Sequence, residues 1–227
     1  MKIKDEKLSV VTEDVDISQK IKIVPQKPVY GFFKRVFDII FSVLGLLILL
    51  VPLLVILLII VIDSPGASPI YVQERHGKNG KRFKFYKLRT MVKDADKIHP
   101  PASDNEMEGP AFKMKEDPRI TRVGKFLRKS SIDELPQLWN VIKGDMSLVG
   151  PRPPLPDEVE KYTDEQMQRL AVTPGITCYW QVQPKRNSLS FDKWLELDIK
   201  YISERSFGTD LKILFKTVGA VFGLEGE

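Results

Sequence analysis

Two neighbouring carboxylates, Asp133 and Glu134, lie in the stretch SSIDELPQLWNVIKGDMSLVGPRP, which covers residues 130–153. Adjacent acids repel one another, so their pairing indicates a local structural use or a shared chemical task. The structural use is a helix start, since Ser131-Ile132-Asp133-Glu134 matches a capping box and acids in a first turn suit the helix dipole. The chemical use is a division of labour, with one carboxylate at a reacting centre and the other holding a metal or a proton. The spacing alone leaves both interpretations open.

The pair is a poor match for glycoside hydrolysis. That chemistry needs two carboxyl groups facing each other, roughly 5–9 Å apart, whereas helical neighbours point about 100° apart. Cations of the kind that bind phosphate oxygens also occur in the chain, at Lys87, Arg128 and Arg152. Each cation alone is more typical of a solvated surface charge. Together with the carboxylates and an apolar segment they indicate a phosphorylated lipid or nucleotide as substrate.

Composition excludes several other kinds of site. The chain has 227 residues and a formal net charge of +5, a modest basic excess that favours anionic partners. Its single cysteine, Cys178, cannot form an internal disulfide, which fits a reducing compartment. The two histidines, His76 and His99, do not complete a Cys/His zinc site. A Walker-type phosphate loop and a strand-linked G-x-G-x-x-G are also missing, so the common nucleotide folds have no support.

Residues 36–62, VFDIIFSVLGLLILLVPLLVILLIIVI, form an apolar run that carries one charge, Asp38. A helix of about 20 such residues crosses a bilayer, so a single transmembrane span is the simplest interpretation. The run starts far from the N-terminus and lacks a small-residue cleavage site, which disfavours a signal peptide.

Two features favour a re-entrant dip over a span. Pro52 lies near the centre of the run, where it removes a helical hydrogen bond and favours a break. Both flanks are basic: Lys34 and Arg35 precede the run, and residues 75–93 contain only basic charges up to Lys93. Because Lys and Arg prefer the cytoplasmic side, a dip keeps both flanks inside, whereas a span places one of them outside.

The remaining pattern predicts a mainly helical chain with one short β-hairpin. We expect a flexible or weakly helical extension over residues 1–33 and a hairpin over 70–91 around Asn79-Gly80. We also expect a loop with short helical pieces over 94–118, a helix within 135–145, a polar helix over 156–170, and a turn with a short strand or loop over 173–187. One apolar stripe near the C-terminus fits either a core helix or a helix in the headgroup plane: Leu211, Leu214, Phe215, Val218 and Phe222.

Four stretches carry a family resemblance: KRVFDIIFSVLGLLILL, PIYVQERHGKNGKRFKFYKLRTM, SSIDELPQLWNVIKGDMSLVGPRPP, and TPGIT followed by WQV. They resemble the bacterial sugar transferases, the monotopic polyprenol-phosphate phosphoglycosyl transferases, in a small minimal form. The resemblance runs from about residue 34 to residue 222. The long gap-free block around the acidic pair is its most specific part and favours catalysis over capping.

The resemblance implies a membrane enzyme of three parts. These are the extension 1–33, a re-entrant helix-break-helix over 34–63 broken at Pro52, and a small cytosolic catalytic domain over 64–227 with amphipathic interfacial helices. Such enzymes transfer a sugar 1-phosphate from a nucleotide diphosphate sugar to undecaprenyl phosphate and release UMP. The implied location is the cytoplasmic face of the inner membrane, among its lipids, with Mg²⁺ as cofactor and no nucleic-acid partner; a homodimer is left open.

The resemblance also assigns roles to residues. Asp133 is the expected nucleophile, and Glu134 its partner in magnesium or proton handling, so both are candidate Mg²⁺ ligands. Lys87, Arg128 and Arg152 are expected to hold phosphates. Gln181 and Arg186 are expected to contact substrate.

The chain departs from the family pattern at three places. Val51-Pro52 replaces a frequent Ser-Pro, Cys178 replaces a frequent Gly, and Gln183-Pro184-Lys185-Arg186 replaces a short Ser-Gly-Arg. These changes leave the break angle and the sugar undetermined. Two other classes stay open, a membrane-surface module that binds anionic lipid and a direct glycosyl transferase. The released nucleotide separates the three classes: a phosphoglycosyl transferase releases UMP, a membrane-surface module releases none, and a direct glycosyl transferase releases UDP.

Overall fold

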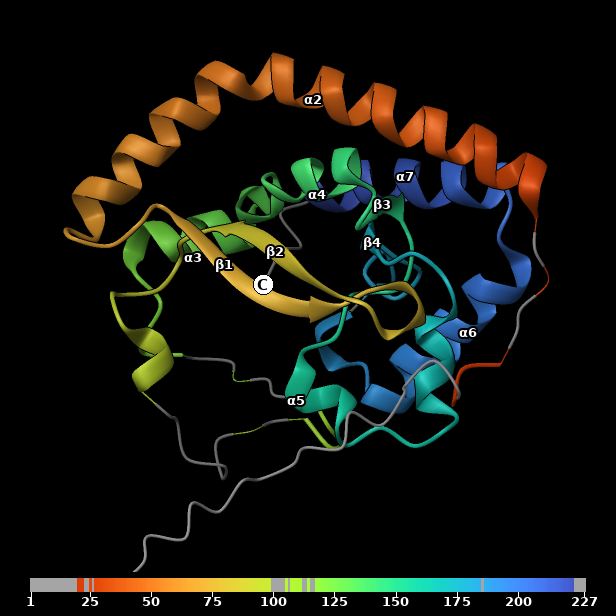
Figure 1. Cartoon of the computed structure of the whole chain (residues 1–227). Coiled ribbons are helices and arrows are strands. Elements are labelled where there is room, and N and C mark those ends of the chain that lie inside the picture. The colour runs from red at the N-terminus through yellow and green to blue at the C-terminus, as the bar shows by residue number, and fades with distance from the viewer. Residues whose placement is uncertain are drawn as a thin grey trace, which may run out of the picture.

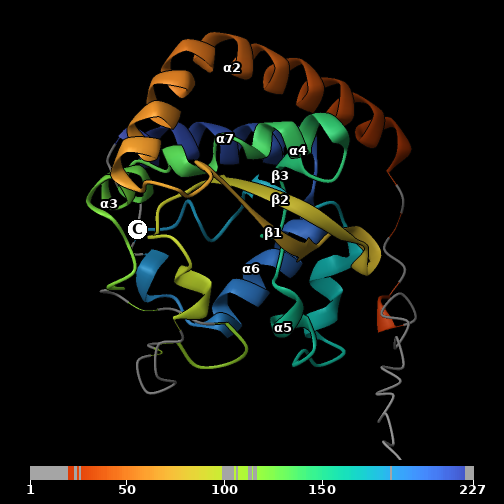
Figure 2. The same cartoon turned by 60° about the vertical axis from the view of Figure 1, so that its left-hand side comes forward.

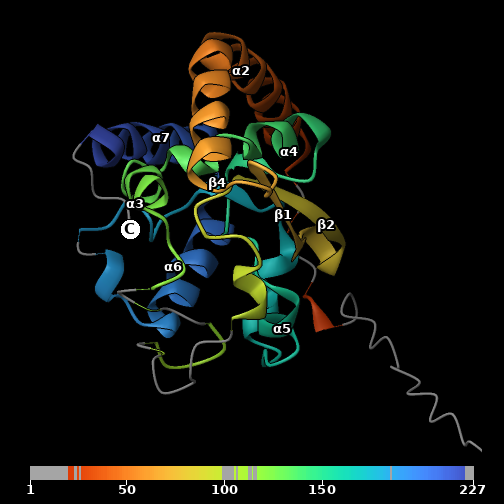
Figure 3. The ribbon, with the colours of Figure 1, turned by 90° about the vertical axis from the view of Figure 1, so that its left-hand side faces the viewer.

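The computed structural model describes residues 20–222, except residues 23–24, 26, 99–104, 106, 112–113, 115–116 and 185. Residues 1–19 of the expected N-terminal extension therefore lie outside the described part. The long helix α2 arches over one side of the molecule, and helices α3, α4 and α7 lie directly beneath it (Figures 1 and 3). A β-hairpin follows below, and α5 and α6 lie on the side away from α2 (Figure 2).

Helix α2 runs from Pro28 to Asp63 and contains Pro52. The helix continues through Pro52, and its arch in Figure 1 has the shape that an internal proline favours, so the expected break is a bend. The helix is long and apolar enough to cross a membrane, and 6% of its apolar window is buried. Its buried residues Asp38, Ser42 and Ile60 mark the face that packs on the domain. The topology relative to a bilayer stays a prediction.

The expected hairpin is confirmed. Strand β1, Ile70–His76, pairs antiparallel with β2, Arg82–Leu88, and a turn at Lys78–Gly80 joins them. Asn79 occupies the left-handed region at φ 56°, which asparagine tolerates better than most residues. Phe83, Phe85 and Lys87 alternate along β2, so all three share the face that carries the buried phenylalanines.

Three short elements bring the acidic pair to the end of this hairpin. Helix α3, Arg122–Lys129, packs so tightly on it that a Cβ on Gly124 would lie 2.0 Å from the carbonyl oxygen of Thr90. A 3₁₀ turn, Ile132–Glu134, and helix α4, Gln137–Lys143, follow. The helix expected within 135–145 is thus confirmed.

A parallel pair of short strands links the two halves of the domain. Strand β3, Ser147–Val149, pairs with β4, Gly175–Thr177. A Cβ on Gly175 would lie 2.0 Å from the nitrogen of Gly150, so the two backbones cross closer than any side chain permits. This crossing places the loop that follows β4 beside the loop that carries Arg152.

The prediction of one helix over residues 156–170 is wrong. The chain instead forms the short helix α5, Pro156–Val159, and a 3₁₀ helix, Gln166–Ala171. Thr163 and Gln166 explain the restart, because each accepts a hydrogen bond from the other's backbone nitrogen, at 3.0 and 3.3 Å. Tyr162, Met167 and Leu170 then pack together in one buried cluster, which a single straight helix would not achieve.

The last described elements are helices α6, Phe191–Glu204, and α7, Phe207–Phe222, while Ala95–Lys97 and Arg186–Ser188 form short 3₁₀ turns. On α7 Ile213 is buried, whereas Phe215 is 76% and Val218 54% exposed. Phe126 on α3 and Trp139 on α4 are also exposed. The layer beside α2 thus presents large apolar side chains outward, as interfacial helices do.

Candidate active site

Asp133 and Glu134 sit in a tight turn that does not cap a helix. Ser131, at the N-cap position, adopts left-handed backbone angles at φ 57°, and its side chain makes no capping hydrogen bond. The capping-box interpretation is therefore wrong. A left-handed non-glycine residue costs about 1–2 kcal/mol, a strain that clusters at functional sites. The side chains of Asp133 and Glu134 are 8% and 18% exposed.

Lys87 reaches the acidic pair from strand β2. Its Nζ lies 3.9 Å from Oδ2 of Asp133 and 3.6 Å from Oε1 of Glu134. The same ammonium group lies over the ring of Phe85, 5.5 Å from its centroid. Burial lowers the pKa of Lys87, while the charges of Glu134 and Asp133 raise it. The structure thus brings three of the expected site residues together.

Arg152 approaches from the loop after β3, and a second arginine supports that loop. Nη1 of Arg152 lies 3.7 Å from Oε1 of Glu134. Nη1 of the buried Arg75 donates a hydrogen bond of 2.9 Å to the carbonyl oxygen of Pro153. Burial, and then the charge of Arg152, lower the pKa of Arg75 to about 10. In the sequence Arg75 stands out only as part of the basic stretch; its place on the inward face of the hairpin was the available signal for this contact.

Asn140 aligns the acidic turn with Lys87. This fully buried side chain on α4 donates a 2.6 Å hydrogen bond to the carbonyl oxygen of Lys84 and accepts one of 3.2 Å from the nitrogen of Tyr86. Both partners belong to β2, so Asn140 fixes α4, and the acidic turn just before it, against that strand. Asn140 was not among the residues predicted for the site, although a polar residue among apolar helix positions is a usable signal.

Arg128 lies on α3, where its Nε donates a hydrogen bond of 3.0 Å to Oγ1 of Thr90. This contact places Arg128 just beyond the end of β2, the strand that carries Lys87. Its phosphate-binding role stays a prediction.

Gln181 and Arg186 share a cavity of about 170 Å³ with Glu134. Nη1 of Arg186 donates to the carbonyl oxygen of Gln181 at 3.2 Å. The buried Cys178 thiol, whose pKa burial raises well above its usual value, donates to Oε1 of Gln181 at 3.1 Å. The cavity also has an apolar wall, formed by Leu135, Leu138, Ile176, Val182 and Ala220. It therefore offers a polar end beside the acidic pair and an apolar side between α4 and α7.

The acidic pair fits Mg²⁺ as a two-carboxylate site. Within the described residues there is no group of three or more His, Cys, Asp or Glu side chains placed to hold a metal. Mg²⁺ in phosphoryl-transfer sites commonly takes one or two protein carboxylates and completes its shell with water and substrate phosphates. Asp133 and Glu134 would be those two ligands, and both this role and Mg²⁺ itself stay predictions.

A bent apolar helix lies above a domain in which a largely buried acidic pair meets nearby cations, an arrangement that fits a membrane-associated enzyme. The model of the family described as bacterial sugar transferase matches residues 29–224, which include α2, the hairpin and the acidic pair. The chain therefore belongs to the bacterial sugar transferase family, and the resemblance seen in the sequence is confirmed.

Known relatives agree with this assignment. The chain is 48% identical over 189 residues to galactosyl transferase CpsE of Streptococcus agalactiae, covering 83% of this chain and 42% of the relative. It is 43% identical over 201 residues to undecaprenyl-phosphate galactose phosphotransferase of Salmonella typhimurium, covering 86% of this chain and 41% of the relative. The exopolysaccharide production protein ExoY of Sinorhizobium fredii is 41% identical over 201 residues, with 86% of this chain and 88% of the relative covered. The chain thus spans less than half the length of the first two relatives.

Proposed function

We propose that this protein transfers a sugar 1-phosphate from a nucleotide diphosphate sugar, a UDP-sugar, to undecaprenyl phosphate. The reaction releases UMP, forms an undecaprenyl-diphospho-sugar and begins the assembly of a bacterial glycan. The supporting observation is the position of the Lys87 ammonium group between Asp133 and Glu134, with Arg152 beside Glu134. The name of the Salmonella relative, which specifies undecaprenyl phosphate and phosphotransfer, supports the acceptor and the reaction class.

In this mechanism the Asp133 carboxylate attacks the sugar-linked phosphorus of the donor. A bond forms between a carboxylate oxygen and that phosphorus, and the bond to the bridging oxygen breaks, so that UMP leaves with the bonding electrons. A phosphate oxygen of undecaprenyl phosphate then attacks the same phosphorus, which frees the Asp133 carboxylate. Covalent catalysis of this kind divides one difficult exchange into two displacements.

The neighbouring charges fit this division. Lys87 and Arg152 offset negative charge on the transferring phosphoryl group, and Glu134 holds both cations near it. Lys87 lies 3.9 Å from Asp133, beyond direct hydrogen-bond distance, so Lys87 acts on this carboxylate through its charge. A Mg²⁺ ion held by Asp133 and Glu134 would supply further neutralisation of phosphate charge.

The acceptor is proposed to enter from the membrane side. The apolar wall of the cavity beside Glu134 suits the first part of a prenyl chain, whose phosphate then lies near the acidic pair. The exposed Phe126, Trp139 and Phe215 suit a layer that rests on one leaflet of the inner membrane. In this placement α2 dips into the cytoplasmic leaflet and returns, and the domain over 64–227 lies on the cytoplasmic face.

A donor screen tests the proposal. The purified chain is incubated with undecaprenyl phosphate, Mg²⁺ and each of several UDP-sugars, and the released nucleotide is identified by chromatography. UMP supports phosphoglycosyl transfer, whereas UDP would indicate direct glycosyl transfer. Absence of both with every donor, under conditions where the ExoY relative is assayed alongside, would favour a membrane-surface module. The Asp133→Asn variant is the matched control for contaminating activity.

A further inference from the structure

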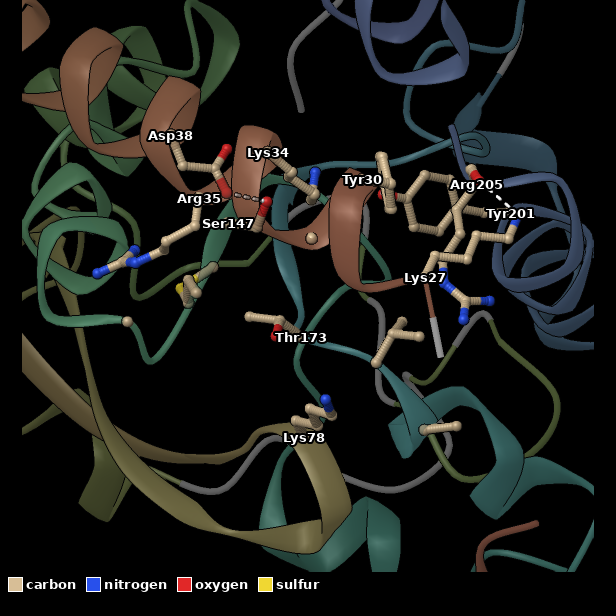
Figure 4. Close-up of a pocket in the computed structure, with 15 residues that line it drawn as sticks. Lys27, Tyr30, Lys34, Arg35, Asp38, Lys78, Ser147, Thr173, Tyr201 and Arg205 are labelled. Carbon is tan, nitrogen blue, oxygen red and sulfur yellow. Dashed lines mark hydrogen bonds between the residues drawn. The ribbon is translucent and has the colours of Figure 1, made fainter. Parts of the chain in front are cut away.

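A second cavity, of about 270 Å³, lies beneath the first turns of α2 (Figure 4). Tyr30, Gly31, Lys34, Arg35 and Asp38 line it at the i, i+1, i+4, i+5 and i+8 positions of one helix face. The other walls come from the hairpin turn, the loop after α4, the segment before β4 and the end of α6. This cavity shares no lining residue with the one beside Glu134, so the two are separate.

The cavity has a strong excess of positive charge. Five cationic side chains line it against one carboxylate, Asp38; the cations are Lys27, Lys34, Arg35, Lys78 and Arg205. Asp38 accepts hydrogen bonds from Oγ of Ser147 at 2.7 Å and from the nitrogen of Leu148 at 3.1 Å. The carboxylate thereby holds α2 on β3, and its charge also offsets that of Lys34.

Most of these cations are not neutralised within the described part of the chain. Lys34 pairs with Asp210 at 2.8 Å. Lys27 donates to the carbonyl oxygen of Arg205, Arg35 to that of Ile142 and Arg205 to that of Pro25. Carbonyl oxygens satisfy donors without cancelling charge. An ammonium group has three N–H donors, so Lys27 and Lys34 keep donors for a further partner.

The position of the cavity indicates where its ligand comes from. The face of α2 away from it is apolar and exposed, with Phe32 66% and Phe33 60% exposed. The polar face of the same turns therefore borders the headgroup region of any bilayer that holds α2. In Figure 4 Lys78 of the hairpin turn lies across the cavity from Lys34, with Thr173 between them. The cationic residues that line the cavity thus come from separate segments: α2 and the residue before it, the hairpin turn and the residue after α6.

We propose that this cavity binds a phosphate group, either that of an anionic lipid headgroup or that of a soluble phosphate compound. The bound phosphate links the start of α2 to the hairpin turn and relieves the repulsion among the cations around it. Lys27, Lys34 and Lys78 donate hydrogen bonds to its oxygens. Arg35 and Arg205, which bind backbone carbonyl oxygens, contribute positive charge nearby. The site serves to hold α2 on the domain, and it does not depend on the reaction proposed above.

Thermal unfolding of the full chain in a neutral detergent tests this. The probes are dihexanoyl phosphatidylglycerol, inorganic phosphate and zwitterionic dihexanoyl phosphatidylcholine. We expect the phosphatidylglycerol to raise Tm by roughly 2–4 °C at about ten times its Kd. A shift with phosphatidylglycerol but not with phosphate identifies a lipid ligand, and a shift with both identifies the phosphate group alone as sufficient.

Variants locate the site. The double substitution Lys27→Ala and Lys78→Ala removes two exposed side chains of the cavity and should abolish the shift. Lys81→Ala, an exposed cation in the same hairpin turn but outside the cavity, should keep it, and so should Arg152→Ala. If the double variant melts differently without ligand, Lys78→Ala alone should still weaken the Kd at least threefold. An unchanged shift in these cavity variants, an equal shift with phosphatidylcholine, or no shift in the unmodified chain would overturn the proposal.

Discussion

The Nζ atom of Lys87 lies 3.9 Å from Oδ2 of Asp133 and 3.6 Å from Oε1 of Glu134, so one ammonium group faces both members of the acidic pair. Lys87 belongs to β2 and the acids to the turn after α3, so tertiary packing creates this contact. Burial of Lys87 lowers its pKa, and the two carboxylates oppose that effect. The charge state of Lys87 therefore depends on the acids that it stabilises.

Activity should fall on the alkaline side at a pH below the ordinary lysine pKa of 10.5. Burial lowers the pKa of Lys87, so its proton is lost earlier as the pH rises, and with it the positive charge near the transferring phosphate. The measurement is kcat/KM for UMP release between pH 6 and 10.5. Lys87→Arg should move the alkaline limb upward, because a guanidinium stays protonated.

Glu134→Gln should shift the alkaline limb of the activity profile in the direction opposite to that expected for Lys87→Arg. Glu134 raises the pKa of Lys87, so removing its charge should lower that pKa further and move the alkaline limb to lower pH. An alkaline limb that stayed in place in both variants would show that another group titrates.

Arg75 should act as a positioning residue for the loop that carries Arg152. Arg75→Met keeps an unbranched side chain against Phe85 but removes the hydrogen bond to the carbonyl oxygen of Pro153. Because Arg152 would then be held less firmly, we expect kcat to fall about 10-fold or more with a smaller change in KM. Arg82→Met, on the same hairpin but exposed, is the matched control and should be near normal. A variant that lost only Tm and kept kcat would reduce Arg75 to a structural role.

Arg152→Ala should lose much of its kcat/KM while the protein stays folded and membrane-bound. Its Nη1 lies 3.7 Å from Oε1 of Glu134, beside the acidic pair at which the proposed mechanism holds the transferring phosphoryl group. Arg152→Lys should recover only part of the activity if the phosphate contact is bidentate. Lys143→Ala, whose ion pair with Asp145 is partly exposed, provides a cation-removal control. Near-normal turnover of Arg152→Ala would make Arg152 a surface charge.

Local signals made the hairpin and α4 predictable from sequence. Asn79-Gly80 between β-rich arms favours a turn, and Leu138, Trp139 and Ile142 give the stretch that forms α4 its helical apolar spacing. The predicted helix over 156–170 is wrong for a local reason as well. The hydrogen bonds between Thr163 and Gln166 start a new helical turn in the middle of this stretch. Polar composition alone did not distinguish one helix from two short pieces.

The arrangement of the site was harder to predict from sequence than the hairpin and α4, because its contacts join segments that lie far apart in the chain. The resemblance named Asp133, Glu134, Lys87 and Arg152, but the roles of Arg75 and Asn140 depend on which backbone carbonyls their side chains meet. The left-handed angles of Ser131 also contradict the capping pattern that its sequence spells. Tertiary packing of the acidic turn against β2 overrides that local preference.

The ends of α2 should lie on the same side of the membrane. Val29 is 70% exposed near the start of the helix, and Ser68 is exposed just after its end. Val29→Cys and Ser68→Cys in a Cys178→Ala background place one thiol at each end; Gly66 is avoided because its φ of 75° disfavours any side chain. We expect an impermeant maleimide to label both only after the cytoplasmic side is exposed. Labelling of one of them in intact spheroplasts would return the single-span interpretation.

Asp133 should carry a covalent sugar phosphate when the enzyme meets donor alone. UMP release should then occur without any polyprenol phosphate, at about one per active enzyme, because the first displacement is complete before the acceptor binds. Mass spectrometry of acid-quenched enzyme should find the sugar-phosphate mass on the peptide that contains Asp133.

Two neighbouring substitutions separate attack from support. Asp133→Asn should abolish the adduct and the burst, because a neutral amide is a poor nucleophile and cannot form the acyl phosphate. Glu134→Gln should slow both half-reactions yet still form the adduct, since it weakens the hold on Lys87 and Arg152 but leaves the attacking group in place. If the two acids only stabilised the start of a helix, either substitution would cost only about 1 kcal/mol of stability and would leave turnover intact. If no adduct forms and UMP release strictly requires the acceptor, a direct in-line transfer replaces the covalent route.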